Sequence, residues 1–360
     1  MANIVDYVRG AEGAALRLNG MNDADALALA LLAGMDWGDR ADGRTLRDAA
    51  RDMPATDWPE LGRLARAMAD SERFGGLGLY AFERADMLEP ALQFAAVTIW
   101  DGHDAYLAYR GTDGSLAGWF EDIQLAYAEP VPAQTRAHGY MMNAARRFPG
   151  GLYLGGHSKG GALALYAGVS AGPAQPRVRR VYSFDGPGMS RAAFESQEYA
   201  DLRGRLLNVV PVRSVVGMLL WQDGETRVVR SDERGVRQHD PFSWLTNARG
   251  LEYAAELSLA SRRLREVARA LLEALPREDL ERLGQALYEL VLSTGARTLA
   301  ELSDYLAGHP EMLSQAPGAV DGRALYMLIY MVAAAGLDAD TAPFAELEPG
   351  QESAGLSGAG

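Results

Sequence analysis

The feature that most constrains the fold of this chain is the pentapeptide Gly-His-Ser-Lys-Gly at residues 156–160. An apolar run at 151–156 leads into it, and a stretch rich in alanine and leucine at 162–171 follows it. These patterns predict a strand that turns directly into a helix. A G-x-S-x-G pattern alone is weak, because a glycine-rich chain of this length matches it by chance in about one case in five. The flanking strand and helix make Ser158 a candidate nucleophile.

The chemistry of an exposed serine nucleophile explains the two glycines. A serine on a sharp strand-to-helix turn needs glycine two positions to either side, so that strand and helix can approach closely. The start of the helix then points free N–H groups at a developing oxyanion. The alternative, a glycine-rich connection without catalytic function, needs no serine. We therefore predict Ser158 as nucleophile and the backbone N–H of Lys159 as an oxyanion donor. We expect the side chain of Lys159, the only lysine, to be solvated and inert.

Strands and helices alternate through the middle of the chain. We expect strands at 92–100, 105–110, 151–156, 178–184, 205–210 and 227–230, with a hairpin turn at 101–104 and helices at 135–147 and 162–171. This order predicts an α/β fold whose mostly parallel sheet is covered on both faces. Helices are expected earlier at 22–35 and 54–70. After about residue 244 leucines recur at helical spacing, and Thr298 and Glu301 form a capping box for a further helix.

Composition excludes several classes of function. The net charge of −13 disfavours binding to nucleic acid or to anionic membranes, and the absence of cysteine excludes disulfides and thiolate catalysis. Residues 1–20 lack the pattern of a secretory signal. The longest apolar stretch, 324–337, is too short to span a bilayer and predicts a buried helix. We therefore expect a cytoplasmic protein without an integral membrane segment.

Three segments of the chain resemble the lipase-like α/β-hydrolases known as the class 3 or fungal-lipase-like group. Residues 108–112, Ala-Tyr-Arg-Gly-Thr, followed by Trp119 and Asp122, resemble the strand of that group that ends in Arg-Gly-Thr/Ser. The segment His-Gly-Tyr at 138–140 resembles its His-x-Gly-Phe. Residues 156–164 resemble its Gly-His-Ser-Leu-Gly-Gly-Ala-Leu-Ala. The helical flanks and the segment 183–188 are similar to an uncharacterised bacterial branch of the superfamily, and the resemblance covers about residues 90–245.

The resemblance implies an α/β-hydrolase fold in which Thr112 supplies the second oxyanion donor, through its backbone N–H and its hydroxyl. A loop directly after a central strand is where such a donor is needed. An ordinary Gly-Thr-Asp-Gly turn is the alternative interpretation of this segment.

A serine nucleophile also needs a histidine that accepts its proton. The chain has five histidines: His103, His138, His157, His239 and His309. In this fold the base follows the nucleophile, which excludes the first three, and His309 lies in a helical region before a proline. His157 is expected to pack or hydrogen-bond locally. His239, in a loop after the strand expected at 227–230, is therefore predicted as the base.

For the acid of the triad the sequence offers one preferred candidate and three alternatives. Fungal-type lipases place it in a segment like 207–214, but no carboxylate occurs there in this chain. Asp185 ends the strand that follows the nucleophile helix and is the preferred candidate, although a turn before glycine and proline also explains it. Asp223, Asp232 and Asp240 are the reserves, of which Asp240 is the weakest because it is adjacent to the histidine.

These residues predict a serine esterase or lipase that forms an acyl-enzyme on Ser158 and needs no metal or organic cofactor. Its expected substrate is a lipid or a small-molecule ester. The alternatives are an amidase or thioesterase, and a catalytically silent protein that binds a ligand or partner in the same cleft. We predict an N-terminal helical segment (1–89), a catalytic core (90–245), a helical cap (246–348) and a flexible tail (349–360). Residues 326–332 are expected either to line an acyl pocket or to be core. The sequence assigns no oligomeric state.

Overall fold

The computed structural model describes residues 2–11, 13–51, 53, 56, 58–87, 92–112 and 116–295. Several predictions fall outside these ranges: the helix that begins at Thr298, the helix at 324–337 with its acyl pocket, His309 and the tail. The predicted domain boundaries stay predictions.

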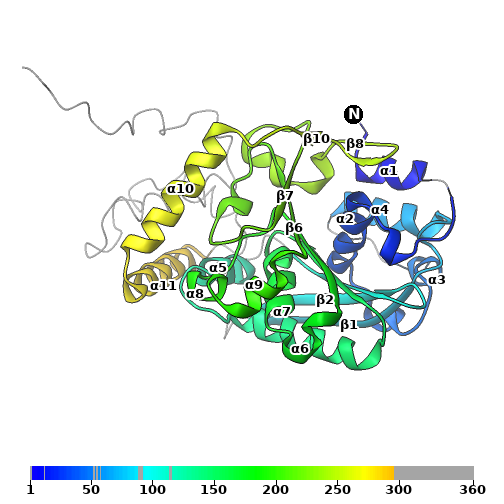
Figure 1. The fold of residues 1–360 in the computed structure, drawn as a ribbon, viewed down its shortest axis with the longest axis horizontal. Coiled ribbons are helices and arrows are strands. Elements are labelled where there is room, and N and C mark those ends of the chain that lie inside the picture. The colour runs from blue at the N-terminus through cyan, green and yellow to red at the C-terminus, as the bar shows by residue number, and fades with distance from the viewer. Residues whose placement is uncertain are drawn as a thin grey trace, which may run out of the picture.

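An eight-stranded sheet runs through the described part of the chain in the order β1-β2-β3-β4-β5-β6-β7-β10 (Figure 1). Its strands are β1 (Gly78–Met87), β2 (Leu92–Trp100), β3 (Ala105–Tyr109), β4 (Leu152–His157), β5 (Val178–Phe184), β6 (Leu206–Pro211), β7 (Glu225–Val229) and β10 (Tyr253–Ala254). Strands β3 to β7 are parallel to one another, whereas β1, β2 and β10 pair antiparallel with their neighbours. The prediction of an α/β fold with a mostly parallel sheet is therefore confirmed.

The register of the parallel strands brings three loops to one edge of the sheet. Tyr109 of β3 lies opposite Gly156 of β4, and His157 of β4 lies opposite Phe184 of β5. The carboxyl ends of β3, β4 and β5 are thus neighbours, and ligands of open α/β sheets bind beyond that edge. The residues that follow these ends are Arg110, Ser158 and Asp185.

Helices cover both faces of the sheet. One face packs on α1 (Ile4–Gly10), α2 (Asp23–Leu31), α3 (Leu46–Ala50) and α4 (Pro59–Asp70), and the other on α6 (Pro132–Arg147), α7 (Lys159–Val169) and α9 (Gln197–Arg203). Side chains of a strand alternate between the two cores. Tyr106 and Ala108 of β3 belong to the first, and Leu107 and Tyr109 to the second. Both faces of the central strands are therefore apolar.

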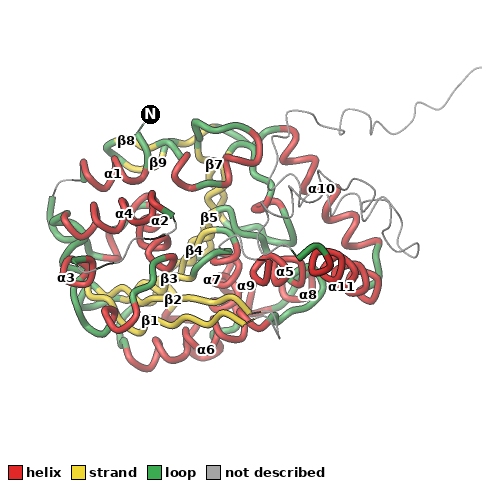
Figure 2. Tube along the Cα trace, turned by 180° about the vertical axis from the view of Figure 1, so that it is seen from behind, coloured by secondary structure: helices red, strands yellow, loops and turns green. Residues whose placement is uncertain are grey.

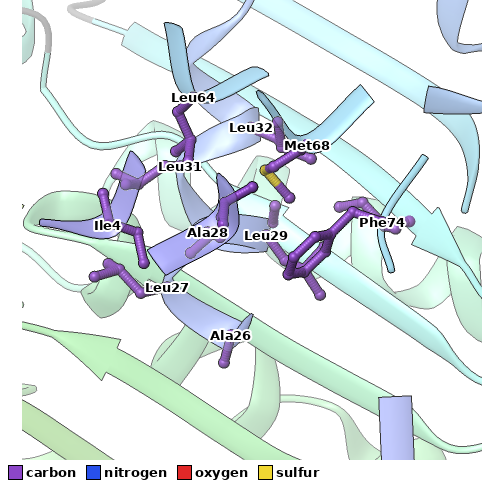
Figure 3. Packing of buried hydrophobic residues seen from close by; sticks show 14 of the residues in the cluster. Ile4, Ala26, Leu27, Ala28, Leu29, Leu31, Leu32, Leu64, Met68 and Phe74 are labelled. Atoms are coloured by element: carbon purple, nitrogen blue, oxygen red, sulfur yellow. The ribbon is translucent and has the colours of Figure 1, made fainter. Parts of the chain in front are cut away.

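The N-terminal helices form a compact apolar layer on the sheet (Figure 3). Helix α2 is apolar on nearly all sides, as is typical of a helix enclosed by other elements. Its N-cap Asn22 and Asp25 form a capping box, as the predicted helix start requires. Asp25 is fully buried and pairs with Arg73, which ties α2 to the segment after α4.

Two long helices, α10 (Leu259–Ala274) and α11 (Arg277–Ser293), lie on the side of the molecule opposite to α1–α4 in both views (Figures 1 and 2). Helix α11 packs on α5 (Leu116–Gln124), where the rings of Tyr288 and Phe120 stack with centroids 3.8 Å apart. Arg269 of α10 donates a hydrogen bond to the carbonyl oxygen of Leu220. Among the described helices, none has the length and apolarity needed to cross a membrane.

The structure corrects the predicted elements at three places. Strand β1 was missed because it is an edge strand with mostly half-exposed side chains and no clean alternation. The prediction of helix from about residue 244 is wrong for the first residues, which form β8 (Thr246–Asn247), β9 (Gly250–Leu251) and β10. Helices α1 and α5, together with the short α8 (Arg191–Phe194), were also not predicted. Strands β2 and β5 have the predicted bounds.

The glycines of two helices respond oppositely to an added methyl group. A Cβ on Gly160 would lie 2.2 Å from the backbone oxygen of Tyr109, whereas one on Gly139 of α6 would meet no atom within 4 Å. We expect Gly160→Ala to lower the free energy of unfolding by about 3 kcal/mol. Gly139→Ala should raise it by about 0.5–1 kcal/mol, because alanine is the better helix former. Urea unfolding of both variants measures this, and equal effects would contradict the close approach at Gly160.

Candidate active site

The turn at Ser158 has the backbone of a strained strand-to-helix connection. Strand β4 ends at His157, α7 begins at Lys159, and Ser158 between them has φ 56° and ψ −130°. A positive φ is uncommon for a residue with a Cβ and is maintained only where the surroundings enforce it. Here the N–H of Ser158 donates to the carbonyl of Phe184 at 2.9 Å, and its own carbonyl accepts from Gly161 at 2.8 Å. The predicted turn is therefore confirmed.

Glycines allow three backbone segments to meet at this turn. A Cβ on Gly156 would lie 2.3 Å from the carbonyl carbon of Gly160, so the strand and the helix touch through both glycines. A Cβ on Gly111 would lie 2.5 Å from the carbonyl oxygen of His157 and 3.3 Å from the Cβ of Ser158. The loop after β3, which contains Thr112, is therefore packed directly against the serine.

His239 and Asp185 are joined by a hydrogen bond, as the prediction required. The Nδ1 atom of His239 lies 2.7 Å from Oδ2 of Asp185, which is fully buried, while the histidine side chain is 27% exposed. An N–H on Nδ1 that donates to a carboxylate leaves Nε2 as the free acceptor of the ring. The pair is held beside the nucleophile turn, since the rings of His239 and His157 have centroids 4.6 Å apart.

The second oxygen of Asp185 is also fully engaged. Its Oδ1 atom accepts hydrogen bonds from the hydroxyl of Ser214 and, at 3.1 Å, from the N–H of Gly217. A Cβ on Gly217 would lie 2.5 Å from this oxygen, so glycine is needed for the approach. The segment 207–214, which lacks a carboxylate, thus supplies a hydroxyl to the carboxylate of the preceding strand.

The three reserve aspartates lie elsewhere than at the ring of His239. Asp223 accepts from the hydroxyl of Tyr199 and pairs with Arg203. Asp240 caps the turn at Pro241–Ser243 by accepting from the N–H of Phe242, and burial raises its pKa. Asp232 lines a hollow of about 310 Å³ together with Asp240 and residues of the N-terminal helices. Among the described aspartates, Asp185 is the one hydrogen-bonded to the ring of His239.

His157 holds the loop that contains His239. Its Nε2 atom lies 2.8 Å from the carbonyl oxygen of His239, so the ring donates to this carbonyl. Burial lowers the pKa of His157 well below its ordinary value, and the neighbouring His239 lowers it further. The ring is therefore neutral at neutral pH. Local hydrogen bonding was predicted for this residue and is confirmed.

Thr112 faces a buried carboxyl group. Its hydroxyl donates to Oδ2 of Asp122 at 2.6 Å, and the other oxygen, Oδ1, is shielded from solvent without a hydrogen-bond partner among the described residues. Burial raises the pKa of Asp122 to about 6, and Glu121 adds to the increase. Lys159, the bond from Thr112 and His239 act in the opposite direction. The predicted oxyanion loop is thus hydrogen-bonded to a carboxyl group of α5 that changes charge near pH 6.

The side chain of Lys159 contradicts the sequence-based expectation. It was expected to be solvated, but it is fully buried and forms an ion pair with Glu121 at 3.0 Å. Its ammonium group also donates to the carbonyl and side-chain oxygens of Gln93. The side chain of Lys159 cannot reach solvent, because other segments of the chain enclose the start of α7.

Several residues of the site escaped sequence reasoning. Ser214, Gly217, Glu121 and Gln93 belong to no local motif, because their partners are remote in sequence. One signal was available: a single lysine next to the nucleophile, in a chain that otherwise uses arginine, indicated a side chain with a particular partner.

The pKa of Asp122 makes the stability of the chain depend on pH. Because its pKa is raised in the folded state, the ionised form destabilises the fold at pH values above about 6, and the cost vanishes below about 4. Asp122→Asn removes this cost. We expect the variant to be more stable than wild type by at most about 3 kcal/mol at pH 8, with little difference at pH 4.

Urea unfolding of both proteins at pH 4, 6 and 8 measures this difference. Asp42→Asn is the control, because the side chain of Asp42 is 82% exposed. A stability difference that does not change with pH would contradict the assignment.

The chain was compared with family models, curated proteins and solved structures. The family model described as Mbeg1-like matches residues 68–289. A search of curated proteins found no match. Among solved structures, a fungal lipase is 14% identical with a TM-score of 0.42, covering 68% of this chain and 90% of its own. A lipase from Yarrowia lipolytica is 13% identical with a TM-score of 0.38, covering 70% and 92%.

A lipase from Rhizopus microsporus var. chinensis is 16% identical with a TM-score of 0.38, covering 71% of this chain and 91% of its own. Because these TM-scores are low, we assign the fold from the sheet order and the turn at Ser158. The matched region runs from the end of α4 to α11 and includes Ser158, Asp185 and His239. The chain belongs to the Mbeg1-like family, a lipase-like family of the α/β-hydrolase superfamily.

Proposed function

We propose that the protein is a serine hydrolase that cleaves carboxylic esters through an acyl-enzyme on Ser158. One observation supports this most strongly: Ser158, at positive φ on a strand-to-helix turn, directly follows His157, whose ring packs against that of His239. Nδ1 of His239 is in turn hydrogen-bonded to the buried Asp185. A positioned nucleophile, a base and a group that orients the base are what acyl transfer requires.

In the proposed reaction His239 accepts the hydroxyl proton of Ser158 while the serine oxygen attacks the ester carbonyl. Asp185 keeps the Nδ1 proton in place and stabilises the imidazolium that forms. The developing oxyanion accepts hydrogen bonds from the backbone N–H groups of Lys159 and Thr112. The protonated His239 then gives its proton to the leaving alcohol. Water, deprotonated by the same histidine, hydrolyses the acyl-enzyme and restores Ser158.

Three features of the site support these roles. The hydrogen bonds of Ser214 and Gly217 hold the carboxyl group of Asp185 in one orientation, as a group that orients the base requires. His157 holds the histidine loop from the other side without adding a charge. The loop that leads to Thr112 and the start of α7 both adjoin the serine, which is the arrangement that two backbone oxyanion donors require. The proposed substrate is an acyl lipid or a small acyl ester.

A fluorophosphonate probe and a chain-length series of p-nitrophenyl esters test the proposal. The wild type should be labelled and should hydrolyse these esters. Ser158→Ala should abolish labelling, and His239→Ala should lower kcat by about ten-thousand-fold. Asp185→Asn should lower kcat by about a thousand-fold or more, because the wrong tautomer of His239 is then favoured. Asp232→Asn is the matched control and should retain activity.

The outcomes separate the competing functions. A folded wild type that the probe does not label would indicate a silent ligand-binding protein and refute the enzyme. Labelling without ester hydrolysis, but with hydrolysis of thioesters or anilides, would redirect the proposal to those substrates. Full activity of Asp185→Asn, with loss in Asp232→Asn, would show that the acid is assigned wrongly.

A further inference from the structure

The side chain of Lys159 takes no part in the proposed reaction, yet it is buried directly behind the nucleophile turn. We propose that Lys159 is a positioning residue: through its ion pair with Glu121, it fastens α5 and the Thr112 loop to the turn that contains Ser158. The inference rests on the proposed function, because it assigns a role in building the oxyanion site. Lys159 would then have two roles: its backbone N–H is an oxyanion donor, and its side chain positions the neighbouring segments.

The ammonium group of Lys159 uses all three of its donors. It lies 3.0 Å from Oε2 of Glu121, 3.1 Å from the backbone oxygen of Gln93 and 3.2 Å from the side-chain oxygen of Gln93. The side chains of Lys159 and Glu121 are both fully buried. A lysine with three fixed partners has one orientation, so its contacts define the position of whatever it binds.

Both carboxylate oxygens of Glu121 also accept hydrogen bonds from backbone N–H groups. Its Oε2 also accepts from the N–H of Gln93 at 3.2 Å, and its Oε1 accepts from the N–H of Ala133 at 2.8 Å. The cluster therefore joins the start of β2, helix α5, the start of α6 and the start of α7. These four segments converge on one pair of opposite charges.

Helix α5 connects this cluster to the oxyanion loop. Asp122, the next residue after Glu121, accepts the hydroxyl of Thr112 at 2.6 Å. A Cβ on Gly118, one turn earlier, would lie 2.3 Å from the side-chain oxygen of Gln93 and 2.9 Å from Cγ2 of Thr112. The helix thus lies against Gln93 and Thr112 at the same time. Any rotation of α5 would move Thr112 relative to Ser158.

An apolar residue at position 159 would fill the same space, but it would form no hydrogen bonds that fix the orientation of its neighbours. The lipase-like pattern that the turn resembles has leucine at this position, and this chain has lysine. A buried ion pair contributes little net stability compared with packed apolar side chains, but it specifies one arrangement of its partners. We infer that the main role of the ion pair is to position its neighbours. It fixes the oxyanion donors of residues 159 and 112 relative to each other.

Steady-state kinetics on a p-nitrophenyl ester and thermal unfolding test this inference. Lys159→Met keeps the backbone N–H, and the double variant Lys159→Met/Glu121→Met replaces both charges by apolar side chains. The double variant leaves no charge buried alone, and we expect it to fold. Its unfolding temperature should lie below that of wild type, because the N–H groups of Gln93 and Ala133 lose their acceptor. Its kcat should nevertheless fall by about 10- to 100-fold, with KM changed by less than about threefold, since a misplaced oxyanion donor affects the transition state.

A partly buried ion pair in the N-terminal helical layer provides the control. Arg73 pairs with Asp25 beneath the N-terminal helices, and Arg73→Met should lower the unfolding temperature while leaving kcat unchanged. Fluorophosphonate labelling of Ser158 should persist in all these variants at a reduced rate for those at positions 159 and 121.

Each result decides the inference. A folded double variant with reduced stability but wild-type kcat would show that the pair is structural only, and wild-type values of both would show that it has neither role. If the double variant fails to fold, Glu121→Gln replaces it: the side chain keeps its size, and wild-type kcat there would equally overturn the inference. Loss of labelling in the wild type itself would instead refute the proposed function, which distinguishes the two failures.

Discussion

The whole site depends on the contact between β4 and α7 at two glycines. Because neither Gly156 nor Gly160 has a Cβ, the strand and helix approach closely, and Ser158 must adopt a positive φ between them. The same absence of side chains at Gly111 lets the loop after β3 reach the serine. Backbone proximity, and not the chemistry of any one side chain, therefore defines where the nucleophile and its neighbours lie.

Around this contact the chain buries charged groups only where partners surround them. Asp185 is held by a histidine, a hydroxyl and a backbone N–H, and Lys159 by a carboxylate and two oxygens of one glutamine. Such groups are costly to bury alone, so each set of partners is also a set of geometric constraints. Asp122 is the exception among them: one of its oxygens lacks a hydrogen-bond partner among the described residues, and burial raises its pKa.

The sequence predicted those parts of the molecule whose signals are local. Apolar runs gave the strands at 92–100 and 178–184, the glycine pattern gave the turn at Ser158, and chain order led to His239. The edge strand β1 has no clean alternation and was missed. The surroundings of Lys159 were predicted wrongly, because burial depends on which remote segments fold over a residue. Ser214 and Glu121 were missed for the same reason, because their hydrogen-bond partners are far away in the sequence.

The cluster behind the nucleophile turn has a consequence for how the chain folds. Lys159 and Gln93 are 66 residues apart in the sequence, and Lys159 and Glu121 are 38 apart. Contacts of such separation form late, because the entropy of closing the intervening loops must be lost before they contribute. The surroundings of Ser158 are therefore complete only when segments that are distant in the sequence have assembled.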